Sequence, residues 1–126
     1  MQMLFQADLG RQTPDEVQAT FWKSGDPVEP EVRGFAEDIF RVAKAQQQKI
    51  DALIAEHSTH WRIERMPAVD RNLLRMAVAE LIGFKSTPFP VVINEALEIG
   101  RRYCAPESVN FLNGVLDSIA RSLIGQ

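Results

Sequence analysis

The chain has 126 residues, of which 45% are hydrophobic and 25% charged, and its formal net charge is −3 at pH 7. A chain of this length buries roughly two-thirds of its unfolded surface and folds as one domain, and its single cysteine excludes an internal disulfide. Because no apolar run reaches about 20 residues and no signal-peptide pattern is present, we expect a cytoplasmic protein that does not enter a membrane, and the lack of basic excess predicts weak intrinsic affinity for nucleic acid.

Helical periodicity runs through nearly the whole sequence, so we predict an all-α fold. The first segment, MQMLFQADLG, is typical of a helix that ends near Gly10 and whose beginning is missing. Thr13 then predicts an N-cap, and Pro14 and Glu16 complete the start of a short helix that continues to Trp22.

The next helix is predicted to be long. One apolar stripe continues from Val32 to Ile54, which indicates a single helix of about 27 residues, or about 40 Å. The pattern is lost over EHSTHWRIERMP at residues 56–67. We place there the divide between two sub-bundles, about 1–66 and 67–126, of one domain.

Three further helices are predicted in the C-terminal half. They run from Pro67 to Phe84, from Val91 to about Tyr103, and from Pro106 to about Leu123, and their short connections favour antiparallel packing. Arg75 and Glu80 interrupt the first of them, and Glu98 can pair with Arg102 at i,i+4. The simpler interpretation of these charges is a solvated helix face.

No constellation of catalytic residues is found. The sequence contains neither a Gly-rich phosphate loop nor a G-x-S-x-G motif, and we expect no cofactor. His57 and His60 are three residues apart, but no third ligand accompanies them, so we predict no metal site. Cys104 has no histidine nearby in the sequence and is interpreted as a buried or half-buried small residue.

Phe111 is the residue that the helical pattern leaves unexplained. It projects about 110° from the middle of the apolar stripe of the last helix. Leaving a Phe side chain in water forgoes about 1.5–3 kcal/mol of burial, and stacking of a nucleobase on its ring is worth about 1–3 kcal/mol. Cover by another element and cover by a partner are therefore both open. The stripe consists of Leu112, Val115, Leu116, Ile119 and Leu123.

Three sequence motifs occur in order in the C-terminal half. They are VDRNLLRMAVAELIGF, PFPVVINEALEIGRRY and ESVNFLNGVLDSIAR. Together with QMLFQAD near the N-terminus, they resemble the NusB transcription-antitermination factors. The resemblance is specific over residues 67–121, whereas residues 11–66 match only in helical pattern.

The resemblance implies an all-α, NusB-like fold of two small helical bundles with six to seven helices, and no catalytic activity. It implies that the protein binds boxA RNA together with the ribosomal protein that acts as NusE. The complex would act on the elongation complex of RNA polymerase and suppress premature termination, notably in ribosomal RNA operons.

The resemblance also assigns an RNA surface. Phe111 matches the aromatic position of the F-x-NGVLD motif, which in this family meets RNA. Its ring is then a stacking platform, with Asn113 and Arg75 as neighbours and Gln2 as a further RNA contact.

A second set of residues is assigned to a protein partner. Asp70 and Glu80 match acidic positions on or near the family's surface for the ribosomal protein. Glu107 matches an acidic position at the start of the last helix.

One departure from the family concerns the N-terminus. Family members usually begin with an arginine-rich arm, whereas this chain begins inside the first helix. Two interpretations stay open: the sequence starts too late or has been shortened, or this is a family member with weakened RNA binding, and the net charge favours weak intrinsic RNA affinity. Exposure of Leu4 and Phe5 there would encourage self-association as a homodimer. Two alternative functions stay open: a protein-interaction module that never binds RNA, and a detached NusB-like RNA-recognition domain of an rRNA methyltransferase.

Overall fold

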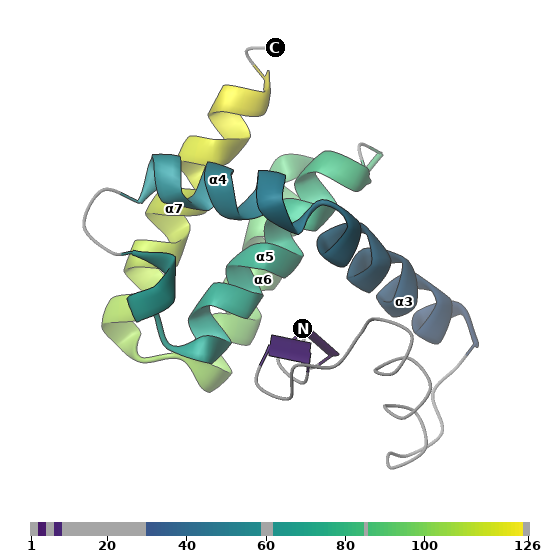
Figure 1. Cartoon of the computed structure of the whole chain (residues 1–126), viewed down its shortest axis with the longest axis horizontal. Helices are drawn as coiled ribbons and strands as arrows, with labels where there is room; N and C mark the ends of the chain where they lie inside the picture. Colours follow the sequence, from purple (N-terminus) through teal and green to yellow (C-terminus); the bar gives the residue numbers. More distant parts are fainter. Residues whose placement is uncertain (1–2, 5–6, 9–29, 59–61, 85, 125–126) are drawn as a thin grey trace.

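The computed structural model describes residues 3–4, 7–8, 30–58, 62–84 and 86–124 (Figure 1). The helices are α3 (Pro30–Ala45), α4 (Gln47–His57), the short 3-10 helix η1 (Ile63–Arg65), α5 (Ala68–Gly83), α6 (Phe89–Tyr103) and α7 (Pro106–Ile124). These residues contain no strand, which confirms the all-α prediction. None of the described helices is long and apolar enough to cross a membrane. The helix expected at residues 13–22 and the helix end near Gly10 lie outside the described residues.

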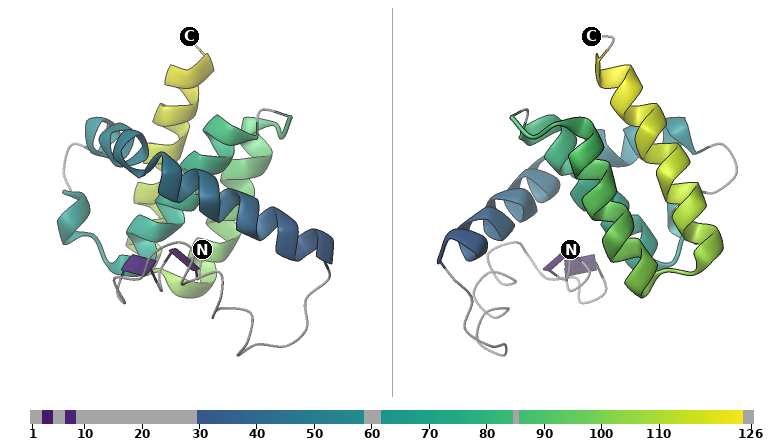
Figure 2. Two further views of the ribbon diagram at one scale, coloured as in Figure 1. Left: turned by 45° about the vertical axis from the view of Figure 1, so that its right-hand side comes forward. Right: turned by 180° about the vertical axis from the view of Figure 1, so that it is seen from behind.

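Helix α5 lies at the centre of the molecule. It packs against α3, α4, α6 and α7, as Figures 1 and 2 show. A helix that is apolar on nearly all sides is buried rather than amphipathic, and α5 accordingly buries more than the single face expected from the sequence. Because α5 lies between the other helices, the buried residues on both sides of it form one hydrophobic cluster. Its buried residues are Asp70, Asn72, Leu73, Leu74, Met76, Ala77, Val78, Ala79, Glu80 and Leu81.

The prediction of one continuous helix from Val32 to Ile54 is wrong. A turn at Gln46, with φ −113° and ψ 24°, separates α3 from α4. The backbone still continues through it, since Gln46 N donates to Val42 O at 3.0 Å and Ile50 N donates to Gln46 O at 2.9 Å. The turn redirects the apolar stripe, because α3 packs on α5 whereas α4 packs on both α5 and α7.

The last two helices match their expected limits closely. α6 begins at Phe89, two residues before the expected start, because Pro90 is tolerated in a first turn where no backbone donor is needed. α6 and α7 pack as antiparallel neighbours (Figure 2). The predicted core stripe of α7 is confirmed: Leu112, Val115, Leu116 and Ile119 are buried, and Leu123 is partly buried.

Candidate functional site

Phe111 lies in the N-terminal half of α7 and is partly buried. Its ring packs against the hydrophobic core instead of standing clear of it. Other parts of the protein therefore cover Phe111 in part, as the first of its two interpretations expected. A partly exposed aromatic ring fixed by the core is also the geometry that a stacking platform requires, because the ring needs no reordering on binding.

Phe111 and Asn113 lie on opposite flanks of α7. Two residues along a helix are separated by about 200°, so their side chains do not face each other. The Asn113 flank faces α6, because Val109, one turn before Asn113, packs over Gly100 of α6. The Phe111 flank faces α4, because Ser118, two turns beyond Phe111, meets His57 of α4. The structure therefore does not bring Asn113 and Phe111 together, although Asn113 is exposed.

Arg75 occupies a partly buried charge cluster on α5. Its Nε and Nη2 donate to the Asp51 carboxylate at 2.9 and 3.1 Å, and its Nη1 donates to Asp8 and to Asn72 Oδ1, both at 3.0 Å. Only 11% of its side chain is exposed. The expectation of a solvated face is wrong here. Other helices cover α5 on all sides, so the Arg75 guanidinium does not face water.

Arg71 extends the same charge cluster to the first helical segment. Its Nε and Nη2 donate to the Asp8 carboxylate at 2.6 and 2.9 Å, and Asn72 Nδ2 also donates to Asp8, at 2.8 Å. Burial acts to raise the pKa of Asp8, but the hydrogen bonds from Arg71 and Asn72 and the nearby arginine charges outweigh it and lower the pKa. The cluster thus ties the N-terminal segment to α4 and α5. Gln2 lies outside the described residues.

The three acidic residues assigned to a protein partner do not form one group. Asp70 is 4% exposed and hydrogen-bonds the Cys104 thiol, and burial followed by this contact raises the pKa of Cys104 to about 12. Glu80 lies ten residues further along α5, about 15 Å away. Glu107 is exposed in the first turn of α7. The half-buried position predicted for Cys104 is confirmed.

Glu80 lines an apolar pocket of about 210 Å³ between α3, α5 and α6. It is 6% exposed. Burial and then the nearby negative charge of Glu95 raise the pKa of its carboxyl group. No described residue forms a hydrogen bond or ion pair with this carboxyl group. Because Glu80 is buried, the solvated face expected for it is also wrong. The sequence signalled this position only as a charge within an apolar helix. The pocket is lined by Leu4, Phe35, Ala36, Ile39, Phe40, Met76, Glu80, Glu95 and Ile99.

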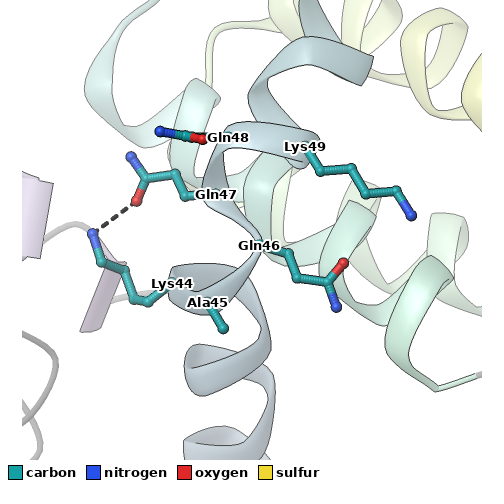
Figure 3. Close-up of a pocket in the computed structure, with 6 residues that line it drawn as sticks. All are labelled: Lys44, Ala45, Gln46, Gln47, Gln48 and Lys49. Carbon is teal, nitrogen blue, oxygen red and sulfur yellow. Dashed lines mark hydrogen bonds between the residues drawn. The ribbon is translucent and has the colours of Figure 1, made fainter.

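A second hollow, of about 460 Å³, lies at the turn between α3 and α4. Residues 44–49 line it, and two of them are lysines. Lys44 donates a hydrogen bond to Gln47 Oε1 at 2.8 Å, while Lys49 points to the opposite side of the chain (Figure 3). The two ammonium groups therefore do not converge on one anion.

Two smaller expectations concern an ion pair on α6 and a metal site. Glu98 pairs with Arg101 at 2.6 Å rather than with Arg102. Among the described residues no group of three or more His, Cys, Asp or Glu side chains could hold a metal ion. His60 lies outside those residues.

Comparisons with known proteins place these features in a family. The model of the NusB family matches residues 1–121. The transcription antitermination protein NusB of Koribacter versatilis is 59% identical over 98% of this chain and 84% of its own length. The protein of the same name from Anaeromyxobacter dehalogenans is 44% identical over 98% of this chain and 86% of its own.

Solved structures show the same similarity. NusB of T. maritima superposes with a TM-score of 0.85 at 34% identity, covering 95% of this chain and 84% of that one. A crystal structure of the antitermination factors NusB and NusE in complex with dsRNA contains a chain with a TM-score of 0.86 and 28% identity, covering 95% of this chain and 89% of that one.

Proposed function

Because this chain belongs to the NusB family, we propose that it is a transcription antitermination factor that binds boxA RNA together with the ribosomal protein serving as NusE. The complex acts on elongating RNA polymerase, notably in ribosomal RNA operons. The protein works in the cytoplasm and catalyses no reaction. The observation that carries the proposal is the 59% identity to a transcription antitermination protein over 98% of the chain.

The RNA site of this proposal centres on Phe111. A ring held by the core and partly exposed offers a stacking surface whose position is already fixed. The side of α7 that meets α4 belongs to this site, because it is the flank on which Phe111 lies. Asn113, on the α6 flank, contacts RNA only where the strand crosses the outer face of α7. Arg75 supports the fold instead of binding RNA, since Asp51, Asp8 and Asn72 accept four of the five N–H donors of its guanidinium and only 11% of the side chain is exposed.

The protein site of this proposal centres on the Glu80 pocket. Two carboxylates, Glu80 and Glu95, lie at an apolar hollow, and the side chain of Phe35 at its wall is 45% exposed. A partner segment with one basic and one apolar side chain complements both properties. A ribosomal protein, which binds RNA phosphates, supplies the basic side chains that such a segment needs. Asp70, about 15 Å from Glu80 along α5, is buried against Cys104 and does not belong to this pocket, whereas the exposed Glu107 is a separate contact to the partner.

Fluorescence anisotropy with labelled boxA RNA tests the proposal. The NusE-type ribosomal protein is present throughout, and a scrambled RNA of the same composition serves as the control. We expect the protein to favour boxA RNA and expect Phe111→Ala to weaken binding about tenfold, from the loss of about 1–3 kcal/mol of stacking. Equal affinity for boxA and scrambled RNA would overturn the proposal.

A further inference from the structure

His57 forms an unusual contact at the end of α4. Its Nδ1 lies 2.7 Å from the hydroxyl oxygen of Ser118 on α7, and the two residues are 61 positions apart in the sequence. The pair lies at the surface, where one ring nitrogen is fixed by the protein. No described residue pairs with the other ring nitrogen, Nε2. Because the Nδ1 contact fixes the ring, Nε2 also has a defined orientation.

The His57–Ser118 pair lies on the same flank of α7 as Phe111. Seven residues separate Phe111 from Ser118, which equals about two helical turns and about 10 Å along the axis. Gly114 lies between them and is exposed, and an added Cβ there would meet nothing within 4 Å. Among the residues that the structure describes, nothing therefore rises over α7 at Gly114, midway along this flank. At about 3.4 Å per stacked nucleotide, it spans about three nucleotides of a single strand.

The chain beyond His57 adds positive charge near the end of α4. Helix η1 contacts α4, and Arg62 and Arg65 at its two ends are exposed, with Glu64 between them. Neither arginine forms an ion pair with a described residue. Glu56, exposed beside His57, balances the second arginine, so the two arginines supply individual donors to a phosphate backbone rather than an excess of positive charge.

We propose that His57 is a second RNA contact, at which Nε2 donates a hydrogen bond to a backbone phosphate about two helical turns from the base stacked on Phe111. This inference rests on the proposed function. Ser118 is the positioning residue: its hydroxyl donates to Nδ1, which leaves the proton on Nε2. The RNA strand then follows the α4 flank of α7 and passes over Gly114.

Four variants test this path by anisotropy with labelled boxA RNA and the NusE-type partner. His57→Ala should weaken binding about two- to tenfold, as the loss of one hydrogen bond predicts. Ser118→Ala should weaken it less, and adding it to His57→Ala should have no further effect. Gly114→Gln should reduce RNA affinity while raising thermal stability, because Gln favours a helix more than Gly does. Gln48→Ala, a neutral and exposed position on the same α4, is the matched control and should leave affinity unchanged.

An NMR titration reads the contact directly. The imidazole Hε1 signal of His57, assigned by its loss in His57→Gln, should shift on addition of boxA RNA and saturate with the affinity measured by anisotropy. If Phe111→Ala weakens binding while His57→Ala, Gly114→Gln and the His57 signal show no effect, this inference is wrong and the proposed function stands. If the unaltered protein does not bind boxA RNA, both are wrong.

Discussion

Replacement of Arg75 by alanine should destabilise the protein strongly. The substitution removes the donors that satisfy Asp51 at 2.9 and 3.1 Å and one donor to Asp8 at 3.0 Å. Removing one partner of a buried ion pair costs about 3–5 kcal/mol, because it leaves an uncompensated charge. Asp8 and Asp51 are 18% and 26% exposed, so water reaches them in part. We therefore expect a loss of about 2–3 kcal/mol in the free energy of unfolding.

Urea denaturation followed by circular dichroism measures this loss. For a domain of this size, about 1 kcal/mol corresponds to about 4 °C in Tm, so the melting temperature should fall by about 8–12 °C. Arg121→Ala is the matched control, because Arg121 is 78% exposed and pairs with Asp117 at i,i+4. Such a surface pair contributes less than about 0.5 kcal/mol. Adding Asp51→Asn to Arg75→Ala should recover part of the loss, since it removes the carboxylate that is left without an arginine, whereas Asp8 keeps its hydrogen bonds from Arg71 and Asn72.

A loss for Arg75→Ala no greater than that for Arg121→Ala would refute this account of the charge cluster. The same variant also tests whether Arg75 contacts RNA. At a temperature where the variant is fully folded, we expect less than about a twofold change in RNA affinity, because the guanidinium is already occupied within the protein. A large loss of RNA affinity in the folded variant would show that Arg75 does contact RNA.

Four further predictions concern Glu80, Cys104 and the core residue Ile119. Burial raises the pKa of Glu80 in the folded state, so the stability contributed by the neutral carboxyl is full below the unfolded pKa and is lost as pH rises through the folded pKa. Glu80→Gln should therefore raise Tm at pH 8 but not near pH 4. Equal effects at both pH values would contradict this. Glu80→Gln should also weaken binding of the basic ribosomal-protein partner in a pull-down, whereas an unchanged interaction would remove Glu80 from that surface. Cys104, with a pKa of about 12, should react with iodoacetamide at pH 8 at least about a hundredfold more slowly than free cysteine until urea unfolds the chain; rapid labelling of the native protein would show an accessible thiolate. Ile119→Ala, at a fully buried position, should cost about 2–5 kcal/mol of unfolding free energy, and Ile124→Ala, 70% exposed, less than about 0.5 kcal/mol; similar losses in urea denaturation would contradict the assigned core.

The sequence predicts helix type and limits well where one periodic stripe faces one neighbour. The last helix is the clearest example, since its apolar stripe is the stripe that the structure buries. The break at Gln46 could not be predicted, because the apolar spacing runs on through it and only the presence of two different neighbours requires the turn. Local periodicity contains no information on which helices a stripe will meet.

The surroundings of the charged residues could not be predicted from the sequence either. Arg75 and Glu80 are separated by five positions on α5, and spacing alone assigns them to a solvated face. In the structure one is satisfied by Asp51 and Asp8 from distant segments, and the other lines a pocket without a described partner. The opposite flanks of Phe111 and Asn113, in contrast, follow from helical geometry alone. Only contact with α4 and α6 shows which flank faces which neighbour.

A transcription assay tests the central claim most directly. RNA polymerase transcribes a template that carries boxA upstream of a terminator, in the presence of the NusE-type ribosomal protein and the other elongation factors. We predict that this protein increases read-through of the terminator, that a scrambled boxA abolishes the increase, and that Phe111→Ala reduces it. Read-through that does not depend on this protein, or that is the same with boxA and with its scrambled form, would contradict its role as an antitermination factor.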